Sequence, residues 1–193
     1  LKTNDFGVDI QVSDETEQLL DTGGGIKRAA LLFDATLPVL IHNVDILSNV
    51  DLASFYKRAL EQKIDALLLV SFRVTQRYLI FDHHMRLVGW TNVATGEVKS
   101  PHDNILHMRF ISPTEDVTSY YQQGYYLYAF SGIHILAPSA IKGVEAVKEE
   151  KFPIMDFYLR NCDTLKIYGE LKADLKLLDV GKLYTLRLAE EFI

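Results

Sequence analysis

Residues 19–46 constrain the fold of this chain more than any other stretch. They hold, in order, a glycine-rich turn, an amphipathic run, an apolar strand and two polar residues, at Thr22-Gly23-Gly24-Gly25, 26–33, 39–41, Asn43 and Asp45. Glycines let backbone N–H groups approach a phosphate or a base, which a Cβ would obstruct. An acid at the carboxyl end of a parallel strand lies where open α/β sheets bind their ligands. This order of elements indicates a nucleotide-binding unit.

The neighbouring stretches continue an alternation of strands and helices. Residues 6–13 alternate between apolar and polar, as a half-buried strand does. Apolar positions in 51–62 have helical spacing, and 66–70 is a continuous apolar run of strand length. The order predicts an α/β fold whose mixed, mostly parallel sheet is flanked by helices.

The second half of the chain has a different character. Residues 78–90 resemble a hairpin with a polar turn, and 91–104 is rich in Gly, Asn, Thr and Pro, which is typical of a loop. The aromatic stretch 120–130 has no interleaved basic residues, so we expect core and pocket wall rather than a surface that stacks nucleic-acid bases. Further elements are expected as strands over 131–136, 165–168 and 175–178, and as helices over 140–149, 154–159 and 183–193.

Composition narrows the classes of partner. The 193 residues fit one domain, and a net charge of −6 without a basic cluster argues against nucleic acid as the main partner. No apolar run approaches the roughly 20 residues of a membrane helix. The single cysteine, Cys162, excludes an internal disulfide and fits a reducing cytoplasm. Because the chain opens on Leu1 with no signal peptide, we expect it to be a piece of a longer protein.

Two acids are candidate metal ligands. Asp45 and Asp179 each follow a short apolar strand, and Asp179 precedes a small turn that ends in Gly181. Mg²⁺ prefers one or two carboxylates together with substrate phosphates, so the two acids could hold one ion or two at the sheet edge. Taken alone, Asp45 could instead cap a helix or stabilise a turn, and the sequence pattern does not distinguish this role from metal binding.

Other motifs carry weaker signals. The triple glycine fits neither a Walker loop nor the G-x-G-x-x-G dinucleotide fingerprint, so an ordinary flexible turn is its alternative. The histidines at 83, 84, 102 and 107 lack the clustering and supporting carboxylate of a zinc site. No histidine lies near Cys162 in sequence, which argues against a cysteine nucleophile.

Several segments together resemble the sugar-1-phosphate nucleotidyltransferase family. They are 21–27 (DTGGGIK), 38–46 (PVLIHNVDI), 130–134 (FSGIH) and 178–182 (LDVGK), and they span essentially the whole chain in order. The branch most similar to them contains the N-acetylmuramate-1-phosphate uridylyltransferases and the mannose-1-phosphate guanylyltransferase-like proteins. The resemblance implies one domain over 1–193 with a Rossmann-like GT-A fold and a small antiparallel subregion on the sugar side.

The resemblance also implies an activity and a set of site residues. A sugar 1-phosphate attacks the α-phosphorus of a nucleoside triphosphate, so that pyrophosphate leaves and a nucleotide sugar forms. Catalytic, Mg²⁺-binding roles would fall to Asp45 and Asp179, and sugar binding to Ser131 and Gly132. The nucleotide side would be formed by Glu15, Thr22, Gly23, Gly24, Gly25 and Asn43. Such transfer depends on positioning and charge neutralisation more than on covalent chemistry. The base and the sugar do not follow from the sequence, and an oligomer remains possible.

One part of the family pattern is absent. Relatives begin with a strand and a G-x-G-T-R-type loop that cradles the triphosphate, and no such loop occurs in these 193 residues. We therefore expect an N-terminal segment to be missing from the sequence. No lysine for the sugar phosphate can be transferred either, because the Glu-Lys-Pro pattern is also absent. Two alternatives stay open: a GT-A glycosyltransferase with a metal motif at 43–45, and a non-catalytic domain that binds a nucleotide sugar.

Overall fold

The computed structural model describes residues 7–181, 185, 189–190 and 192. The helices within these residues are α1 (Asp21–Ala29), α2 (Leu52–Gln62), α3 (Asp103–Leu106), α4 (Pro138–Glu145) and α5 (Ile154–Asn161), with 3₁₀ turns η1 (Ala30–Leu32) and η2 (Val117–Tyr120). The strands are β1 (Val39–His42), β2 (Ile46–Ser48), β3 (Ala66–Ser71), β4 (Arg77–Phe81), β5 (Leu87–Asn92), β6 (Glu97–Lys99), β7 (Tyr121–Gln122), β8 (Tyr125–Leu136), β9 (Ile167–Leu171) and β10 (Leu177–Asp179). None of the described helices is long and apolar enough to cross a bilayer.

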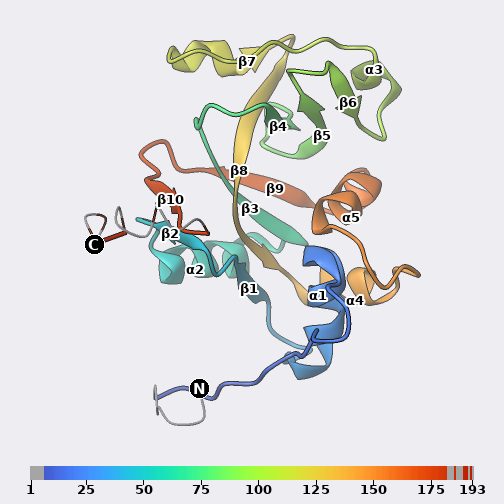
Figure 1. Ribbon diagram of the computed structural model, residues 1–193. Helices are drawn as coiled ribbons and strands as arrows, with labels where there is room; N and C mark the ends of the chain where they lie inside the picture. Colours follow the sequence, from blue (N-terminus) through green and yellow to red (C-terminus); the bar gives the residue numbers. More distant parts are fainter. Residues whose placement is uncertain (1–6, 182–184, 186–188, 191, 193) are drawn as a thin grey trace.

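The long strand β8 joins the two parts of the molecule (Figure 1). Its carboxyl half lies between β1 and β3, and its amino half pairs with β4 and β7. The main sheet has the order β6-β5-β4-β8-β3-β9, and a separate two-stranded sheet joins β10 to β2. Among the described strands only β3 and β9 pair in parallel. The predicted α/β class is confirmed, but the mostly parallel sheet is wrong, because the seven other pairings between described strands are antiparallel.

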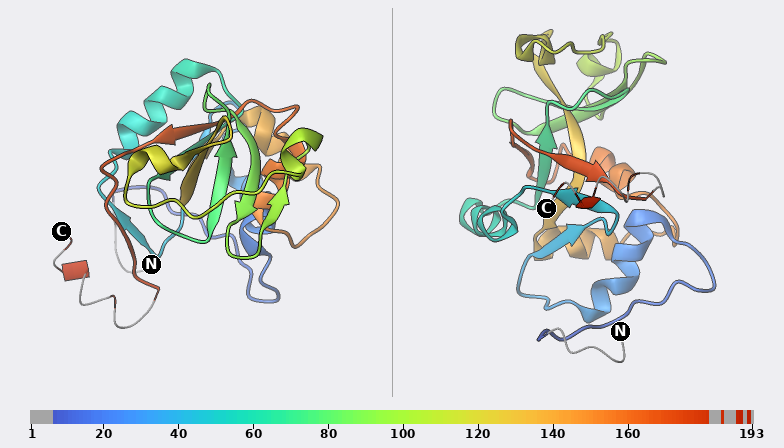
Figure 2. Two further views of the ribbon diagram at one scale, coloured as in Figure 1. Left: turned by 90° about the horizontal axis from the view of Figure 1, so that it is seen from above. Right: turned by 60° about the vertical axis from the view of Figure 1, so that its left-hand side comes forward.

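Helices cover both faces of the lower half of the sheet (Figure 2). All six residues of β3 are buried, and its side chains alternate between two apolar clusters. Leu67 and Leu69 pack with Phe55 of α2, whereas Leu68 and Val70 belong to the larger cluster that contains Ile26 of α1. The continuous apolar run therefore has the physical cause expected from the sequence, which is burial on both faces.

The hairpin and the aromatic core were predicted correctly. Strands β4 and β5 pair antiparallel, and Tyr120 and Tyr128 are almost fully buried. The loop expected over 91–104 contains one further strand, β6, which extends the sheet beyond β5. Helix α4 ends at Glu145, four residues earlier than expected. The helix predicted over 183–193 lies largely outside the described residues.

Two local predictions near the amino end are wrong. Residues 7–13 form no strand, and the apolar side chains of Val8 and Val12 are 68% and 70% exposed. A strand needs a neighbouring edge to satisfy its backbone groups, and no described strand lies beside this segment. The glycine-rich motif is not a turn, because it forms the first half of helix α1.

Packing explains why glycines occupy this part of a helix. A Cβ on Gly24 would lie 2.2 Å from the backbone oxygen of Glu150, and one on Gly23 would lie 2.4 Å from the ring of Phe152. The backbone N–H groups of Gly23 and Gly24 both donate to the Phe152 carbonyl, at 2.9 and 3.1 Å. Close approach of two backbones thus outweighs the low helix propensity of glycine.

Candidate functional site

The carboxylates of Asp45 and Asp179 meet over one glycine. A Cβ built on Gly181 would lie 3.1 Å from Asp179 Oδ1 and 3.1 Å from Asp45 Oδ2. Both acids are exposed, and Asp179 Oδ1 accepts from the Gly181 N–H at 2.9 Å, whereas no described residue forms a hydrogen bond or ion pair with the Asp45 carboxylate. The structure therefore brings together two acids that lie far apart in the sequence, and Gly181 leaves open the space that a side chain would fill.

Backbone pairing holds the two acids in place. Strands β2 and β10 pair antiparallel, with Asp179 opposite Ile46, and the Val180 N–H donates to the Asp45 carbonyl at 2.8 Å. Asn49 fastens the far end of this pair: its side chain donates to the Asp174 carbonyl and accepts from the Lys176 N–H. Asn49 is a positioning residue that the sequence did not reveal, because its partners are remote in the chain.

This donor set fits a hard divalent cation. Carboxylate oxygens are ligands that Mg²⁺ accepts, and this ion usually keeps sites open for water and phosphate. Within the part of the chain that the structure describes, no group of three or more His, Cys, Asp or Glu residues could hold a metal. Two carboxylates beside an empty space match an ion that takes its remaining ligands from a substrate.

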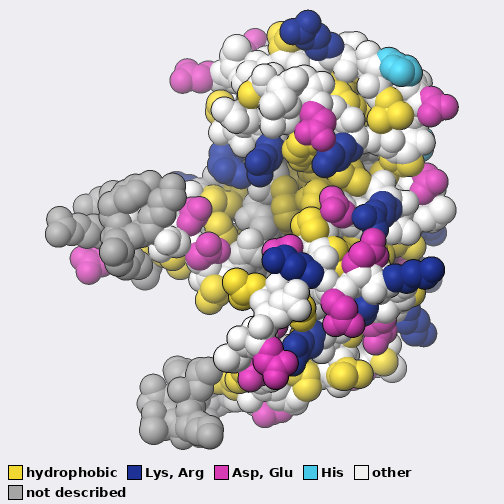
Figure 3. Space-filling model, turned by 45° about the vertical axis from the view of Figure 1, so that its right-hand side comes forward, with side chains coloured by type: hydrophobic (Ala, Val, Ile, Leu, Met, Phe, Trp, Pro, Cys, Tyr) yellow, Lys and Arg dark blue, Asp and Glu magenta, His cyan; other side chains and the backbone are white. Residues whose placement is uncertain are grey.

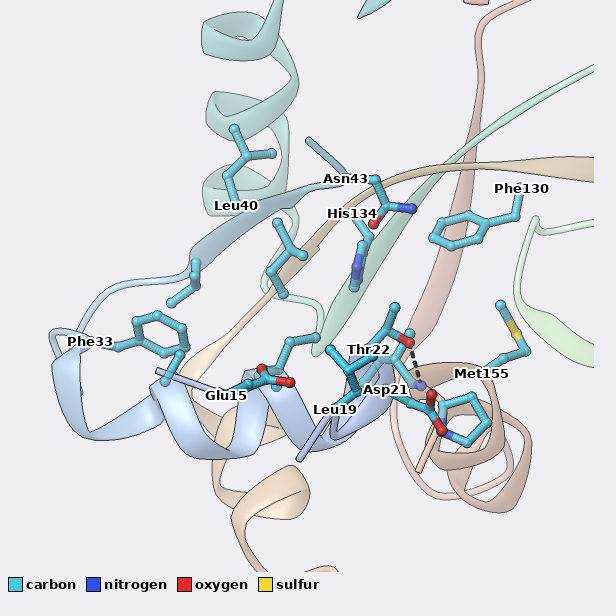
Figure 4. Close-up of a pocket in the computed structure, with 17 residues that line it drawn as sticks. Glu15, Leu19, Asp21, Thr22, Phe33, Leu40, Asn43, Phe130, His134 and Met155 are labelled. Carbon is cyan, nitrogen blue, oxygen red and sulfur yellow. Dashed lines mark hydrogen bonds between the residues drawn. The ribbon is translucent and has the colours of Figure 1, made fainter. Parts of the chain in front are cut away.

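A largely apolar cavity of about 750 Å³ lies beside α1, bounded by β1, β8 and the start of α5 (Figure 4). Its polar lining includes Glu15, Thr22, Asn43 and His134, each from a different segment. Nucleotide-sized ligands bind in cavities of this size, with a few polar groups fixing their orientation. Asn43 connects the cavity to the acid pair, because it precedes Asp45 by only two residues.

Most of the predicted nucleotide-binding groups already have structural partners. Glu15 Oε2 accepts from the Leu20 N–H at 3.0 Å, and Thr22 Oγ1 accepts from the Ile154 N–H at the start of α5. The N–H groups of Gly23 and Gly24 bind the chain at Phe152. Of the three glycines only Gly25 lines the cavity, with a site for a Cβ 2.7 Å from Glu15 Oε1. The nucleotide-binding roles of all six residues stay predictions, and Glu15, Thr22, Gly25 and Asn43 line the cavity whereas Gly23 and Gly24 do not.

The predicted sugar-side residues lie next to Asn43, at a β-bulge. Gly132 has φ +80°, and a Cβ there would lie 2.8 Å from Asn43 Nδ2. The Ser131 hydroxyl donates to the Leu69 carbonyl and accepts from the Ile133 N–H, where the register between β3 and β8 shifts. Gly132 therefore borders the site through its backbone. The buried Ser131 hydroxyl takes the place of the backbone hydrogen bonds that are lost between β3 and β8 at the bulge.

His134 is a polar group that the sequence analysis did not single out. The residue is 2% exposed, and burial lowers the pKa of the imidazole to about 3, so the ring is neutral. Nδ1 shares a hydrogen bond with the hydroxyl of the fully buried Tyr158. No described residue bonds to Nε2, and the ring lines the cavity near Asn43, with its centroid 5.5 Å from that of Phe130 (Figure 4). The sequence contained no signal that His134 lines a cavity, because a histidine within an apolar strand is expected to be a core residue.

The remaining reactive residues do not form a site. Burial raises the pKa of the Cys162 thiol to about 11, and the thiol donates to the Leu159 carbonyl. The Cys162 thiolate is thus not activated, in agreement with the argument from sequence. The rings of His83 and His84 lie 3.8 Å apart between centroids and are tilted by 45° in the β4–β5 turn, and both residues are exposed.

No protein-family model matches the sequence, and no curated protein matches it. Solved structures do share its fold. HddC from Yersinia pseudotuberculosis aligns with a TM-score of 0.59 and 18% identity over 90% of this chain and 63% of its own. A candidate glucose-1-phosphate thymidylyltransferase from Bacillus anthracis, solved with sucrose, aligns with a TM-score of 0.58 and 10% identity over 88% of this chain and 59% of its own.

The inositol-1-phosphate CTP transferase from T. maritima aligns with a TM-score of 0.57 and 12% identity, over 89% of this chain and 60% of its own. At these identities the likeness shows the fold alone. The chain spans about three fifths of the length of these structures. Two of the three are named for nucleotidyl transfer to a phosphorylated sugar or polyol.

Proposed function

We propose that the complete protein transfers a nucleotidyl group from a nucleoside triphosphate to a sugar 1-phosphate, giving a nucleotide sugar and pyrophosphate. The observation that carries this proposal is the meeting of Asp45 and Asp179 over Gly181, beside a nucleotide-sized cavity. The fold shared with nucleotidyltransferases supports it. Neither a glycosyltransferase nor a non-catalytic binding domain is favoured by these neighbours.

The carboxylates would hold Mg²⁺, which supplies charge neutralisation for a triphosphate when bound. Asp45 and Asp179 would orient it from the paired β2 and β10 strands, whose backbone hydrogen bonds hold both carboxylates in place before the substrates arrive. Asn43 would position the nucleotide, and the Gly132 backbone would border the sugar because a side chain there would collide with Asn43. Neutral His134 offers Nε2 as one hydrogen-bonding group on the cavity wall.

We also propose that a preceding segment with a phosphate-binding loop completes the triphosphate site. Two observations support this. Among the described strands β1 pairs only with β8, so its other edge is free to accept a further strand. The structural neighbours are also longer than this chain. The same proposal places the protein in the branch that contains the N-acetylmuramate-1-phosphate uridylyltransferases and the mannose-1-phosphate guanylyltransferase-like proteins. It also places the protein in the cytoplasm and in polysaccharide synthesis.

Pyrophosphate release by the full-length protein tests the proposal. Each nucleoside triphosphate would be combined with a panel of sugar 1-phosphates and Mg²⁺, with Asp45→Asn as the inactive variant. Asp103→Asn, an exposed acid on α3, is the matched control. Release that needs both substrates, is lost in the Asp45 variant and persists in the Asp103 variant supports the transferase. No release from any pair by the folded protein overturns it.

A further inference from the structure

His134 is held firmly in the wall of the cavity beside α1. Backbone pairing fixes it from both sides, because it is opposite Ile41 of β1 and Leu68 of β3. The rings of Phe130 and Tyr158 meet the imidazole edge-on, with their centroids 5.5 and 5.7 Å from its own. The position and the orientation of the imidazole are therefore set by the sheet and by α5 before any ligand arrives (Figure 4).

The hydrogen bond to Tyr158 decides which nitrogen of the imidazole carries the proton. Burial raises the pKa of the Tyr158 hydroxyl well above its usual value, so the hydroxyl keeps its hydrogen. Among the described residues this hydroxyl has no partner except Nδ1 of His134. If Nδ1 were the donor, the buried hydroxyl hydrogen would lack an acceptor, which is unfavourable. Tyr158 therefore donates to Nδ1, and the single ring proton of the neutral imidazole is on Nε2.

Nε2 of His134 is open to the cavity rather than sealed in the core. It forms no hydrogen bond with a described residue, yet among the described side chains only Ser13 Oγ is both fully buried and without a partner. Solvent or a ligand can therefore reach Nε2, although the residue as a whole is 2% exposed. The ring opens onto the cavity, which it lines. A donor in this position takes its acceptor from water or from a ligand.

The walls of this cavity suit an uncharged, flat group better than a phosphate. Within the described part of the chain, its charged lining residues are the acids Glu15 and Asp21, with no lysine or arginine. Figure 3 shows Lys and Arg side chains on both sides of a hollow between the upper and lower parts of the molecule, so positive charge for phosphates is available outside this cavity. Apolar side chains, among them Ile26, Ile41 and Phe130, form most of the remaining wall. A hexose would leave hydroxyls without partners there, whereas a nucleotide base has two apolar faces and polar atoms only at its edge.

A single fixed donor at the edge of a base distinguishes among the four bases. Uracil, guanine and cytosine each have a carbonyl oxygen, which projects from the ring and accepts hydrogen bonds. Adenine has no carbonyl: its acceptors are ring nitrogens, and the group that projects from its ring is an amino donor. Because His134 is set back in the wall, a projecting oxygen reaches Nε2–H more readily than a ring nitrogen does. An amino group would meet it donor to donor, which a site with a fixed hydrogen bond rejects.

We infer that His134 is a specificity-determining residue whose Nε2–H donates to a carbonyl oxygen of the nucleotide base, and that Tyr158 is the positioning residue that keeps the proton on Nε2. This assignment rests on the proposed function for the presence of a nucleotide, but the binding it predicts needs no sugar phosphate and no turnover. It narrows the choice of base, because uridine, guanosine and cytidine nucleotides are favoured over adenosine nucleotides.

Nuclear magnetic resonance measures the site of the ring proton directly. In the full-length protein with isotope-labelled histidine, proton–nitrogen correlation spectra distinguish a protonated ring nitrogen from an unprotonated one. A His134→Gln sample identifies the signals of His134 by their loss. We expect the proton on Nε2 in the parent and a mixture of both tautomers in Tyr158→Phe. A proton on Nδ1 in the parent overturns the inference.

Binding of UTP, CTP, GTP and ATP with Mg²⁺ would be compared by calorimetry on the full-length protein, with competition titrations for weak binders. We expect ATP to bind most weakly and at least one other nucleotide to bind tenfold or more tightly. His134→Phe should weaken the best nucleotide about tenfold and leave ATP within about twofold, because only the former loses a hydrogen bond. His134→Gln keeps an N–H donor and should restore most of the affinity.

Two further variants separate a lost donor from a disturbed fold. Combining His134→Phe with Tyr158→Phe removes both members of the buried pair, so no polar group is left unsatisfied and the protein should fold. This double variant should show the same selective loss as His134→Phe. Met155→Leu changes a cavity residue that has no hydrogen-bond donor, and it should alter the affinities for all four nucleotides alike.

The outcomes distinguish the inference from the proposed transfer. Equal losses of affinity for ATP and for the best nucleotide in the double variant, or tightest binding of ATP by the parent, overturn the inference even if pyrophosphate is released. Base-selective binding without pyrophosphate release from any sugar 1-phosphate would refute the transfer and keep the inference. Absence of nucleotide binding by the folded parent would overturn both.

Discussion

The acid pair on β2 and β10 and the glycine-rich start of α1 were both predicted as functional motifs, yet they differ in how their polar groups are used. Around α1, Glu15, Thr22 and the N–H groups of Gly23 and Gly24 bind other parts of the chain. The Asp45 carboxylate has no such partner among the described residues. Groups already engaged within the fold contribute to stability, whereas an exposed, convergent acid without a partner is available to a ligand. Mutations should therefore separate the two regions.

The largest effect is expected at the acid pair. Asp45→Asn and Asp179→Asn should each lower the rate of pyrophosphate release by about 10³-fold, as loss of one charge-stabilising group does. The double variant should be little worse than either single one, because the two acids act as a unit. Melting temperatures should stay within about 1 °C of the parent. Additive losses in the double variant would mean that the acids act separately.

The second effect, at Gly24, should fall on stability instead. Gly24→Ala places a Cβ 2.2 Å from the Glu150 carbonyl, and backbone cannot yield cheaply, so we expect a loss of about 2 kcal/mol or more. In Gly25→Ala the Cβ meets only the end of the Glu15 side chain, and alanine favours helices. That variant should be at least as stable as the parent. Urea unfolding distinguishes them, and a stable Gly24 variant would show that the contact with Glu150 is unimportant.

The contrast also shows what a sequence can reveal. The approach of Asp45 and Asp179 to each other was predictable because each follows a short apolar strand, a signal read from consecutive residues, and their metal-binding role stays a prediction. The glycines were misread because their local turn preference says nothing about the approach of 150–152, which is remote in the chain. His134 and Tyr158 meet only because α5 packs beside β8, so no local pattern could pair them.

A third effect concerns pH. The pKa of His134 is about 3 in the folded state against about 6.5 when unfolded, so below pH 6.5 the unfolded chain binds a proton that the folded protein does not. The stabilising effect of the neutral ring is complete above pH 6.5 and is lost as the pH falls toward 3, by up to about 1.4 kcal/mol per unit. Comparing unfolding of the parent and His134→Gln at pH 7, 6 and 5 tests this. If the free energy of unfolding changed with pH equally in the parent and in His134→Gln, the His134 ring would have to be in contact with solvent or an anion.

The smallest effect is expected at Thr22. Thr22→Val removes the oxygen that accepts from the Ile154 N–H at the start of α5, which should cost about 1 kcal/mol in the free energy of unfolding. Thr95→Val is the comparison, because it removes an oxygen that accepts from the Glu97 N–H at 3.3 Å in the exposed β5–β6 turn, where water can replace it. An unchanged Thr22 variant would indicate that water caps α5 equally well and that the hydroxyl is available to a ligand.

Binding of Mn²⁺, a spectroscopic substitute for Mg²⁺, tests the central claim most directly. The full-length protein would be titrated with Mn²⁺ in the presence of a nucleoside triphosphate, and bound ion would be measured by electron paramagnetic resonance. We predict one or two bound ions in the parent and in Asp103→Asn, and at least tenfold weaker binding in Asp45→Asn and Asp179→Asn. Unchanged Mn²⁺ affinity in both variants would contradict the assignment of the acid pair as the metal site.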